Sequence, residues 1–214
     1  MRFLRLLTIG ERRGRIASVP DLASAVGMGA AYLAQGASYS YIRARSGMVA
    51  PRLMEDAAFG EAMDRCKWEG FAAAAGDLAL IVEGDLRGHG PAPAAFWRRL
   101  YREVLAAEPV PPHRAGAGWD DRIAEFDARL ERHIAGPPGG IEDVADFSAN
   151  VILEYAPVDE IIREVDREMV TNNVKFRFID HVTDLRRRTD WPALAAAVQA
   201  AAQSAGEGLP EPQR

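Results

Sequence analysis

Residues 119–140 read WDDRIAEFDARLERHIAGPPGG, and this stretch decides the fold class. Its apolar residues recur every three or four positions, at Trp119, Ile123, Phe126, Leu130 and Ile134. This is the spacing of one face of an α-helix, and charged residues occupy the positions between. The glycine–proline run at 136–140 then breaks the pattern. The stretch therefore predicts an amphipathic helix whose apolar face packs against other helices.

The same spacing continues on both sides of this stretch. Residues 93–108 and 141–155 each show an apolar face at helical spacing. Prolines at 109–112 and at 157 separate these patterns, because proline ends a helix and restricts the residue before it. The middle of the chain is therefore predicted to be a series of helices joined by short loops.

Two longer helices are predicted towards the amino terminus. Ser18 and Asp21 have the spacing of a capping box, and the helix they begin is expected to reach about Ser46 and stop at Gly47. A second helix is predicted over Pro51–Arg87. Its glycines predict a kink or a split, and its short aliphatic run at 78–82 is also compatible with a buried strand.

The chain after Pro157 carries the longest pattern, over residues 158–188. Its apolar residues follow four–three spacing, at Val158, Ile162, Val165, Met169, Phe176 and Ile179. Asn172 falls in the same row, and a polar residue in such a row can fix the register of a paired helix. Residues 174–178 also alternate as a half-buried strand would, so a short strand or hairpin near 170–178 is the alternative. We favour the helix.

Composition is consistent with one domain. The chain has 214 residues, of which 48% are hydrophobic and 27% charged, as in ordinary globular proteins. Its single cysteine, Cys66, excludes an internal disulfide and any metal cage built from several cysteines. We predict an all-α, irregular bundle of six to eight helices over residues 18–205, including a last alanine-rich helix capped by Thr189 or Asp190. Residues 206–214 are predicted to be a disordered tail.

Charge is distributed unevenly. Residues 1–46 carry a net charge of +5 and the remainder −10, for a total of −5. The acidic total argues against a nucleic-acid binder that relies on bulk positive charge. Residues 1–17 form a basic amphipathic arm, in which Arg2, Phe3, Arg5 and Leu6 are expected to meet an anionic membrane surface, a partner or the acidic body. The uncharged run at 22–42 is rich in small residues and favours a buried helix over a membrane span.

Tyrosine and arginine side chains cluster on the first long helix. Both residue types are typical anchors of protein interfaces. The cluster therefore predicts a surface for a protein partner or for self-association. Its members are Tyr32, Tyr39, Tyr41, Arg43 and Arg45.

Three carboxylates on the second helix, Glu69, Asp77 and Glu83, are the candidate ligand-binding or catalytic groups. Carboxylates on an otherwise apolar helix can bind metal in a bundle core. The chain contains no Glu-x-x-His pair of the kind that di-iron bundles use. The alternative is an exposed ion pair between Arg65 and Glu69, one helical turn apart.

Ser38 and Cys66 are the candidate nucleophiles. Residues 36–40 read GASYS, one residue short of a nucleophile elbow, but the flanks are helical and an elbow requires a preceding strand. Cys66 lies between Arg65 and Lys67, which would lower the pKa of its thiol. Neither residue has a histidine at a diagnostic spacing, so small core residues are the favoured interpretation of both.

The sequence as a whole favours a non-catalytic helical interaction protein: an adaptor, an assembly factor or an accessory subunit. We expect it in a bacterial cytoplasm, with the basic arm able to place it at the inner face of the membrane. The alternative is a helical-bundle enzyme or ligand-binding protein that uses the carboxylates, or a serine hydrolase that uses Ser38. No cofactor, metal or catalytic set is assigned.

Overall fold

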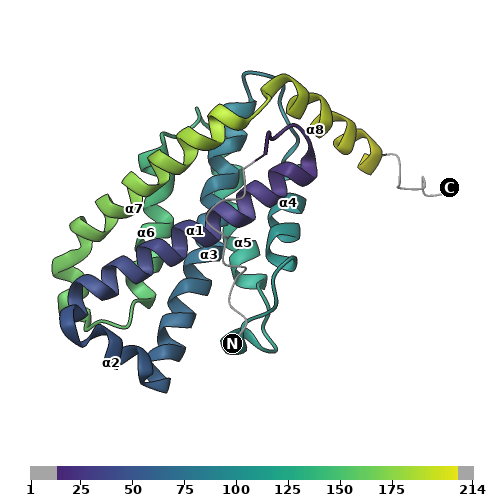
Figure 1. Cartoon of the computed structure of the whole chain (residues 1–214). Helices are drawn as coiled ribbons and strands as arrows, with labels where there is room; N and C mark the ends of the chain where they lie inside the picture. The colour runs from purple at the N-terminus through teal and green to yellow at the C-terminus, as the bar shows by residue number, and fades with distance from the viewer. Residues whose placement is uncertain (1–13, 207–214) are drawn as a thin grey trace.

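Eight α-helices make up the part of the chain that the computed structural model describes, residues 14–206 (Figure 1). They are α1 (Val19–Ser46), α2 (Ala50–Glu55), α3 (Ala57–Leu86), α4 (Ala94–Ala106), α5 (Asp120–Ala135), α6 (Ile141–Tyr155), α7 (Glu160–Arg188) and α8 (Trp191–Gly206). Short 3-10 turns lie at Gly47–Val49 and Pro112–Arg114. The predicted all-α class is confirmed, and so is the predicted number of helices.

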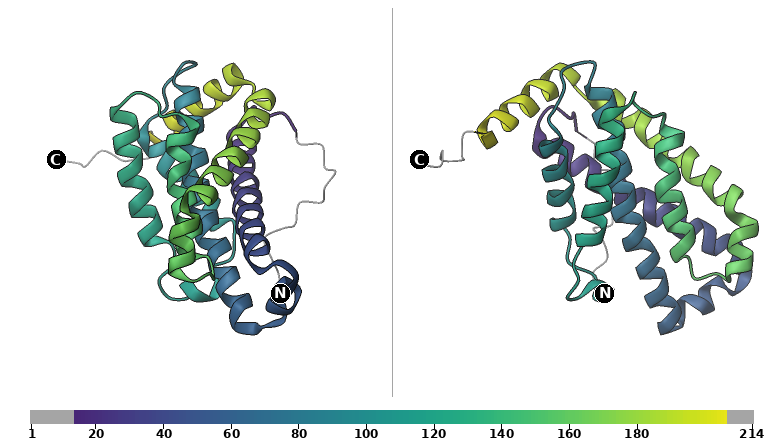
Figure 2. Two further views of the ribbon diagram at one scale, coloured as in Figure 1. Left: turned by 90° about the vertical axis from the view of Figure 1, so that its left-hand side faces the viewer. Right: turned by 180° about the vertical axis from the view of Figure 1, so that it is seen from behind.

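Helix α3 is the centre of the bundle. Every residue from Trp68 to Glu83 is buried, because α1, α4, α5 and α6 all pack against this helix (Figures 1 and 2). Small side chains allow this close packing: a Cβ atom added to Gly70 would lie 2.8 Å from Cγ1 of Ile152 on α6. The aliphatic run at 78–82 is therefore part of a helix buried on all sides, and is not a strand.

The ends of α1 follow the local signals in the sequence. The Ser18 side chain accepts a hydrogen bond from the backbone N–H of Asp21, and the Asp21 carboxylate accepts one from the backbone N–H of Ser18. Gly47 ends the helix at φ +49°, a conformation that favours glycine. The predicted second helix is split, but at Asp56 and not at a glycine. The Asp56 side chain accepts a 2.8 Å hydrogen bond from the backbone N–H of Phe59 and so caps α3.

Helix α7 runs along the outside of the bundle, where it packs against α6 and α1 (Figure 2, left). It is continuous through residues 170–178, so the alternative of a strand or hairpin there is wrong. Val170, Val174 and Phe178 are buried on one side of the helix. Within residues 14–206 the only β-type pairing is a single bridge between Ile16 and Thr189.

That bridge attaches the amino-terminal side of the chain to the α7–α8 junction. The backbone N–H of Ile16 donates to the Arg188 carbonyl at 3.0 Å, and the N–H of Asp190 donates to the Ile16 carbonyl at 2.8 Å. Ile16 itself is buried. The arm residues Arg2, Phe3, Arg5 and Leu6 and the tail after 206 lie outside the described residues. Among the described helices, none is both long enough and apolar enough to cross a bilayer.

Candidate functional site

The tyrosine–arginine cluster predicted on α1 is divided between the interior and the surface. Tyr41 is buried, and its hydroxyl donates a 3.0 Å hydrogen bond to Asp166 on α7. Arg45 binds both carboxylate oxygens of the same Asp166. Burial raises the pKa of Tyr41 and outweighs the opposing effect of Arg45. In this structure, Tyr41 and Arg45 hold α7 against α1 through Asp166, and Arg45 keeps 42% of its side chain exposed.

The other members of the cluster lie at the surface. Tyr39 and Arg43 are exposed on α1. Tyr32 is also about half exposed, and its ring stacks against that of His181 on α7, with centroids 6.1 Å apart. Tyr39 and Arg43 are thus exposed on α1, whereas Tyr32 contacts α7.

A row of exposed apolar side chains lies on α7, and we call it the α7 stripe. It consists of the exposed Ile162, Val165, Met169 and Phe176, together with the polar Asn172 and the partly buried Ile179, which continue the same row. Val165 is 78% exposed and Phe176 is 68% exposed, and the neighbouring Ile161 is 77% exposed. The buried residues of the same helix follow a separate row on its inner side, at Asp166, Val170, Val174, Phe178, His181 and Leu185. Helix α7 is therefore apolar on two faces, and only one of them is covered.

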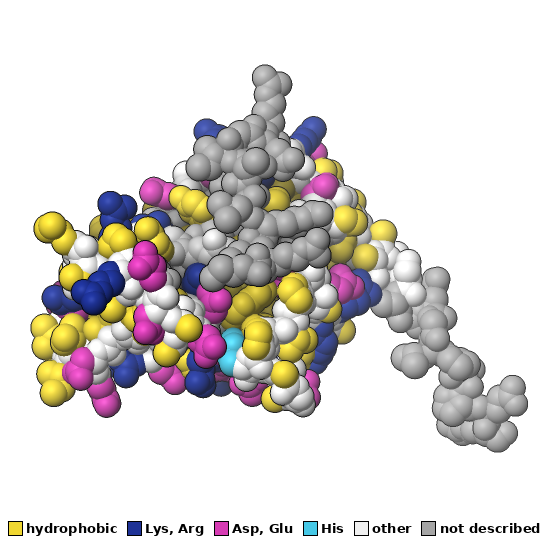
Figure 3. All heavy atoms as spheres, turned by 60° about the horizontal axis from the view of Figure 1, so that its bottom comes forward, with side chains coloured by type: hydrophobic (Ala, Val, Ile, Leu, Met, Phe, Trp, Pro, Cys, Tyr) yellow, Lys and Arg dark blue, Asp and Glu magenta, His cyan; other side chains and the backbone are white. Residues whose placement is uncertain are grey.

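Other exposed apolar residues lie near the turn between α1 and α2, at the end of the molecule where α7 begins. Met48 is 99% exposed in the turn between α1 and α2, and Val49 beside it is also exposed. Figure 3 shows hydrophobic side chains gathered at the left end of the molecule, where Figure 1 places α2 and the start of α7. Groups of exposed apolar side chains of this kind mark interaction sites more often than single ones do.

The carboxylate of Glu69 is buried in a network of cationic side chains. Arg114 donates two hydrogen bonds of 2.6 Å to it, and Arg122 donates one of 3.0 Å. Nε2 of His113 lies 2.8 Å from Oε1 of Glu69. Burial raises the pKa of Glu69, but the hydrogen bonds from Arg114 and His113 outweigh it, so the pKa is lowered. The carboxylate is charged and fully paired.

The other two candidate carboxylates have separate partners. Asp77 is paired with Arg129 of α5 and accepts a 3.0 Å hydrogen bond from the backbone N–H of Ser148. Burial raises its pKa in spite of these contacts. Glu83 is paired with Arg87 at 2.7 Å and lies 3.1 Å from His133. Its pKa is lowered, because the interactions with His133 and Arg87 together outweigh the effect of burial.

The three carboxylates thus form a row of separate buried ion pairs along α3. The predicted exposed pair between Arg65 and Glu69 is wrong, because Glu69 faces the interior and Arg65 does not contact it. Within residues 14–206, no three His, Cys, Asp or Glu side chains are grouped to hold a metal ion. A sequence signal for the arginine partners does exist: Arg122 and Arg129 are seven residues apart, so they share one edge of the predicted apolar face of α5.

Ser38 and Cys66 form a small buried contact between α1 and α3. The Cys66 thiol lies 3.3 Å from Oγ of Ser38 and 3.4 Å from the carbonyl oxygen of Ile152. Ser38 is fully buried within α1, so it lies on no nucleophile elbow. Burial raises the pKa of the Cys66 thiol to about 11, and the expected lowering by Arg65 and Lys67 is wrong. Both residues pack the helix interface.

We expect the Cys66 thiol to be unreactive in the folded protein, because it is buried and protonated at neutral pH. Ellman's reagent should detect less than about one tenth of a thiol per chain in buffer and a full equivalent in guanidinium chloride. Rapid labelling of the native protein at pH 7, with unchanged circular dichroism, would contradict this placement.

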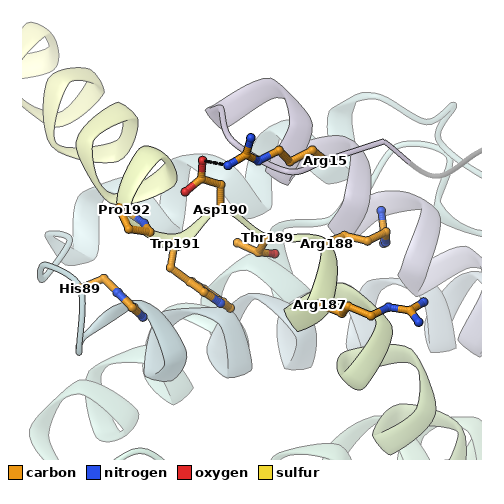
Figure 4. Close-up of a pocket in the computed structure, with 8 residues that line it drawn as sticks. All are labelled: Arg15, His89, Arg187, Arg188, Thr189, Asp190, Trp191 and Pro192. Atoms are coloured by element: carbon orange, nitrogen blue, oxygen red, sulfur yellow. Dashed lines mark hydrogen bonds and ion pairs between the residues drawn. The ribbon is translucent and has the colours of Figure 1, made fainter.

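An open pocket of about 510 Å³ lies at the junction of α7 and α8 (Figure 4). Its lining includes three arginines and a stacked aromatic pair: Arg15, Arg187, Arg188, His89 and Trp191. Arg15 is paired with Asp190, and the other two arginines are paired with Asp184. Two carboxylates of the chain itself, Asp190 and Asp184, therefore offset two of the three positive charges of the lining.

Comparisons with known proteins give no relative. No protein-family model matches the sequence, and no curated protein or solved structure is significantly similar to it.

Proposed function

We propose that this protein is a non-catalytic interaction protein that binds another polypeptide through the outer face of α7. The single observation that carries the proposal is the α7 stripe, a helix face with apolar side chains that the bundle leaves uncovered. Covering such a face removes apolar surface from water, which is the main favourable contribution to most protein association. An adaptor, an assembly factor or an accessory subunit would use the stripe in this way.

The polar groups of the bundle support the same proposal. The candidate catalytic groups Glu69, Asp77 and Glu83 are each bound by arginine, and Ser38 is buried against Cys66. These residues stabilise the packing of α3 with its neighbours. The exposed anchors Tyr39 and Arg43 on α1 are of the residue types that interfaces favour.

A photo-crosslinking experiment tests this function. Phe176 is replaced by p-benzoylphenylalanine, which forms covalent bonds with a polypeptide held against it, and the protein is irradiated in the cells that produce it. The matched control carries the same residue at Ala128, which is exposed on α5. We expect an adduct from position 176 and none from position 128. Equal labelling at both positions, or none at either, would refute a binding role for α7.

The cellular location is proposed from the sequence. We place the protein in the cytoplasm, with residues 1–17 as a basic segment that suits the anionic inner face of a membrane. The net charge of +5 over residues 1–46 supports this proposal.

A further inference from the structure

We infer that the polypeptide covering the α7 stripe is a second copy of this chain, with the two α7 helices packed antiparallel about a two-fold axis. The inference rests on the proposed function and adds the identity of the partner. It starts from the spacing of the stripe. Its residues repeat at intervals of three and four from Ile162 to Ile179, which is the spacing of a coiled-coil seam. A seam of this kind is suited to an equally long helix.

Charge selects the antiparallel orientation. Residues 160–173 of α7 carry a net charge of −2, and residues 174–188 carry +3. An antiparallel pair sets the acidic half of one helix beside the basic half of the other, and it also aligns the two helix dipoles favourably. A parallel pair would set like halves together. The charges of helix α7 are therefore complementary to those of a second α7 helix only when the two helices are antiparallel.

The antiparallel register also matches the sizes of the side chains. The three–four spacing divides the seam into a positions (Ile162, Met169, Phe176) and d positions (Val165, Asn172, Ile179). In an antiparallel coiled coil, each a position of one helix faces a d position of the other. Ile162 then faces Ile179 of the partner subunit, and the small Val165 faces the large Phe176 of the partner subunit. Met169 faces Asn172 of the partner subunit, so both asparagines lie next to the two-fold axis, where they fix the register. Each contact occurs twice, as two-fold symmetry requires.

Charged residues beside the stripe are also complementary in the antiparallel register. The same register places Glu168 of one helix beside Lys175 of the other, on the edge of the seam. Glu168 is exposed, and it forms no ion pair with another described residue. Lys175 is partly buried, with 22% of its side chain exposed, and it already pairs with Asp146 at 2.8 Å, so Glu168 of the partner subunit would share this lysine with Asp146. In a parallel pair, Glu168 would instead face the neutral Asn173 of the partner subunit.

Sedimentation velocity on the full chain tests the inference. One chain has a mass of 23.4 kDa, so we expect a species of twice that mass at micromolar concentration. Met169→Glu should weaken dimerisation at least tenfold, because it places a charge in each central layer. The matched control Ala128→Glu should leave the dimer unchanged. Circular dichroism, which should be unchanged, shows that each variant is folded, whereas the melting temperature of Met169→Glu should fall because the dimer no longer stabilises the fold.

Charge exchange tests the orientation. Glu168→Lys alone and Lys175→Glu alone should each weaken the dimer, since each sets like charges together in the antiparallel register. The double variant should regain dimerisation to within a few-fold of the original protein. A double variant no tighter than the single ones would overturn the antiparallel pairing.

The outcomes separate this inference from the proposed function. A monomer at 100 µM, or a dimer that is indifferent to Met169→Glu, would overturn pairing through α7. If crosslinking at position 176 then yields an adduct with a different polypeptide, the proposed function stands and only the identity of the partner is wrong. If it yields no adduct, both are wrong.

Discussion

Replacing Glu69 with alanine is expected to lower the free energy of unfolding by about 3–5 kcal/mol, the usual cost of removing one partner from a buried ion pair. Glu69 is only 2% exposed and binds Arg114, Arg122 and His113 together. Without it, two buried guanidinium groups lose their shared counter-charge. Urea denaturation followed by circular dichroism measures the loss.

The matched control is Glu103→Ala, on α4. Glu103 is exposed and lies 3.7 Å from Arg99, one helical turn away. Exposed pairs of this kind contribute about 0–1 kcal/mol, so the control should be nearly neutral. Equal losses in the two variants would show that the buried network does not stabilise the bundle.

The contribution of Glu69 should also depend on pH. Because the pKa of Glu69 is lowered in the folded protein, its stabilisation is fully present above the usual carboxyl value near 4.5 and is lost as the pH falls through the lower folded value. The stability difference between the original protein and Glu69→Ala should therefore be constant from pH 6 to 7 and shrink below about pH 4.5.

Replacing Gly29 with alanine is expected to destabilise the protein by about 1–3 kcal/mol, the cost of adding atoms to a filled core. The new Cβ atom would lie 2.3 Å from Nε2 of His181 and 3.0 Å from Cδ1 of Leu78. His181 is itself buried, so its ring has little room to move. The change therefore strains the site where α1, α3 and α7 meet.

The control is Gly60→Ala on α3, which is expected to raise the stability of the protein. No atom lies within 4 Å of the Cβ position at Gly60, so the better helix propensity of alanine should raise stability by about 0.5–1 kcal/mol. A double-mutant cycle with His181→Ala should recover much of the cost at position 29, because it removes the nearer contact. If Gly29→Ala were as stabilising as Gly60→Ala, the close packing of α7 on α1 would be refuted.

Local signals were sufficient to predict most of the helices. The predicted limits of the helix at 141–155 agree with the structure, and so does the end of α1 at Ser46, because capping residues, glycine and proline act within a few residues. The glycines of the second helix do not predict the split at Asp56, because they lie within the continuous α3, whereas the N-cap residue Asp56 begins it.

The candidate site depends on contacts that spacing along the chain does not reveal. Arg114, which binds Glu69, lies 45 residues further on, in a loop. Cys66 is flanked by two basic residues, but neighbours on a helix point in different directions, and burial determines its pKa. Tyr39 and Tyr41 are close in sequence yet lie on different sides of α1, one exposed and one buried.

The α7 stripe shows both the value and the limit of periodicity. The four–three spacing correctly identified residues that share one face of a helix. It did not show that this face is the outer one, because Val170, Val174 and Phe178 supply a second apolar row that packs inward. Two apolar rows on one helix can be told apart only when the neighbours of that helix are known.

The burial of residues 68–83 of α3 on every side limits which substitutions the chain can accept. An ordinary amphipathic helix tolerates change at the solvent-facing positions of every turn, so its mutational tolerance rises and falls with the helical period. Residues 68–83 have no such positions. Random mutagenesis should therefore reveal one unbroken intolerant segment there, in which the alanines and glycines are as restricted as Phe71.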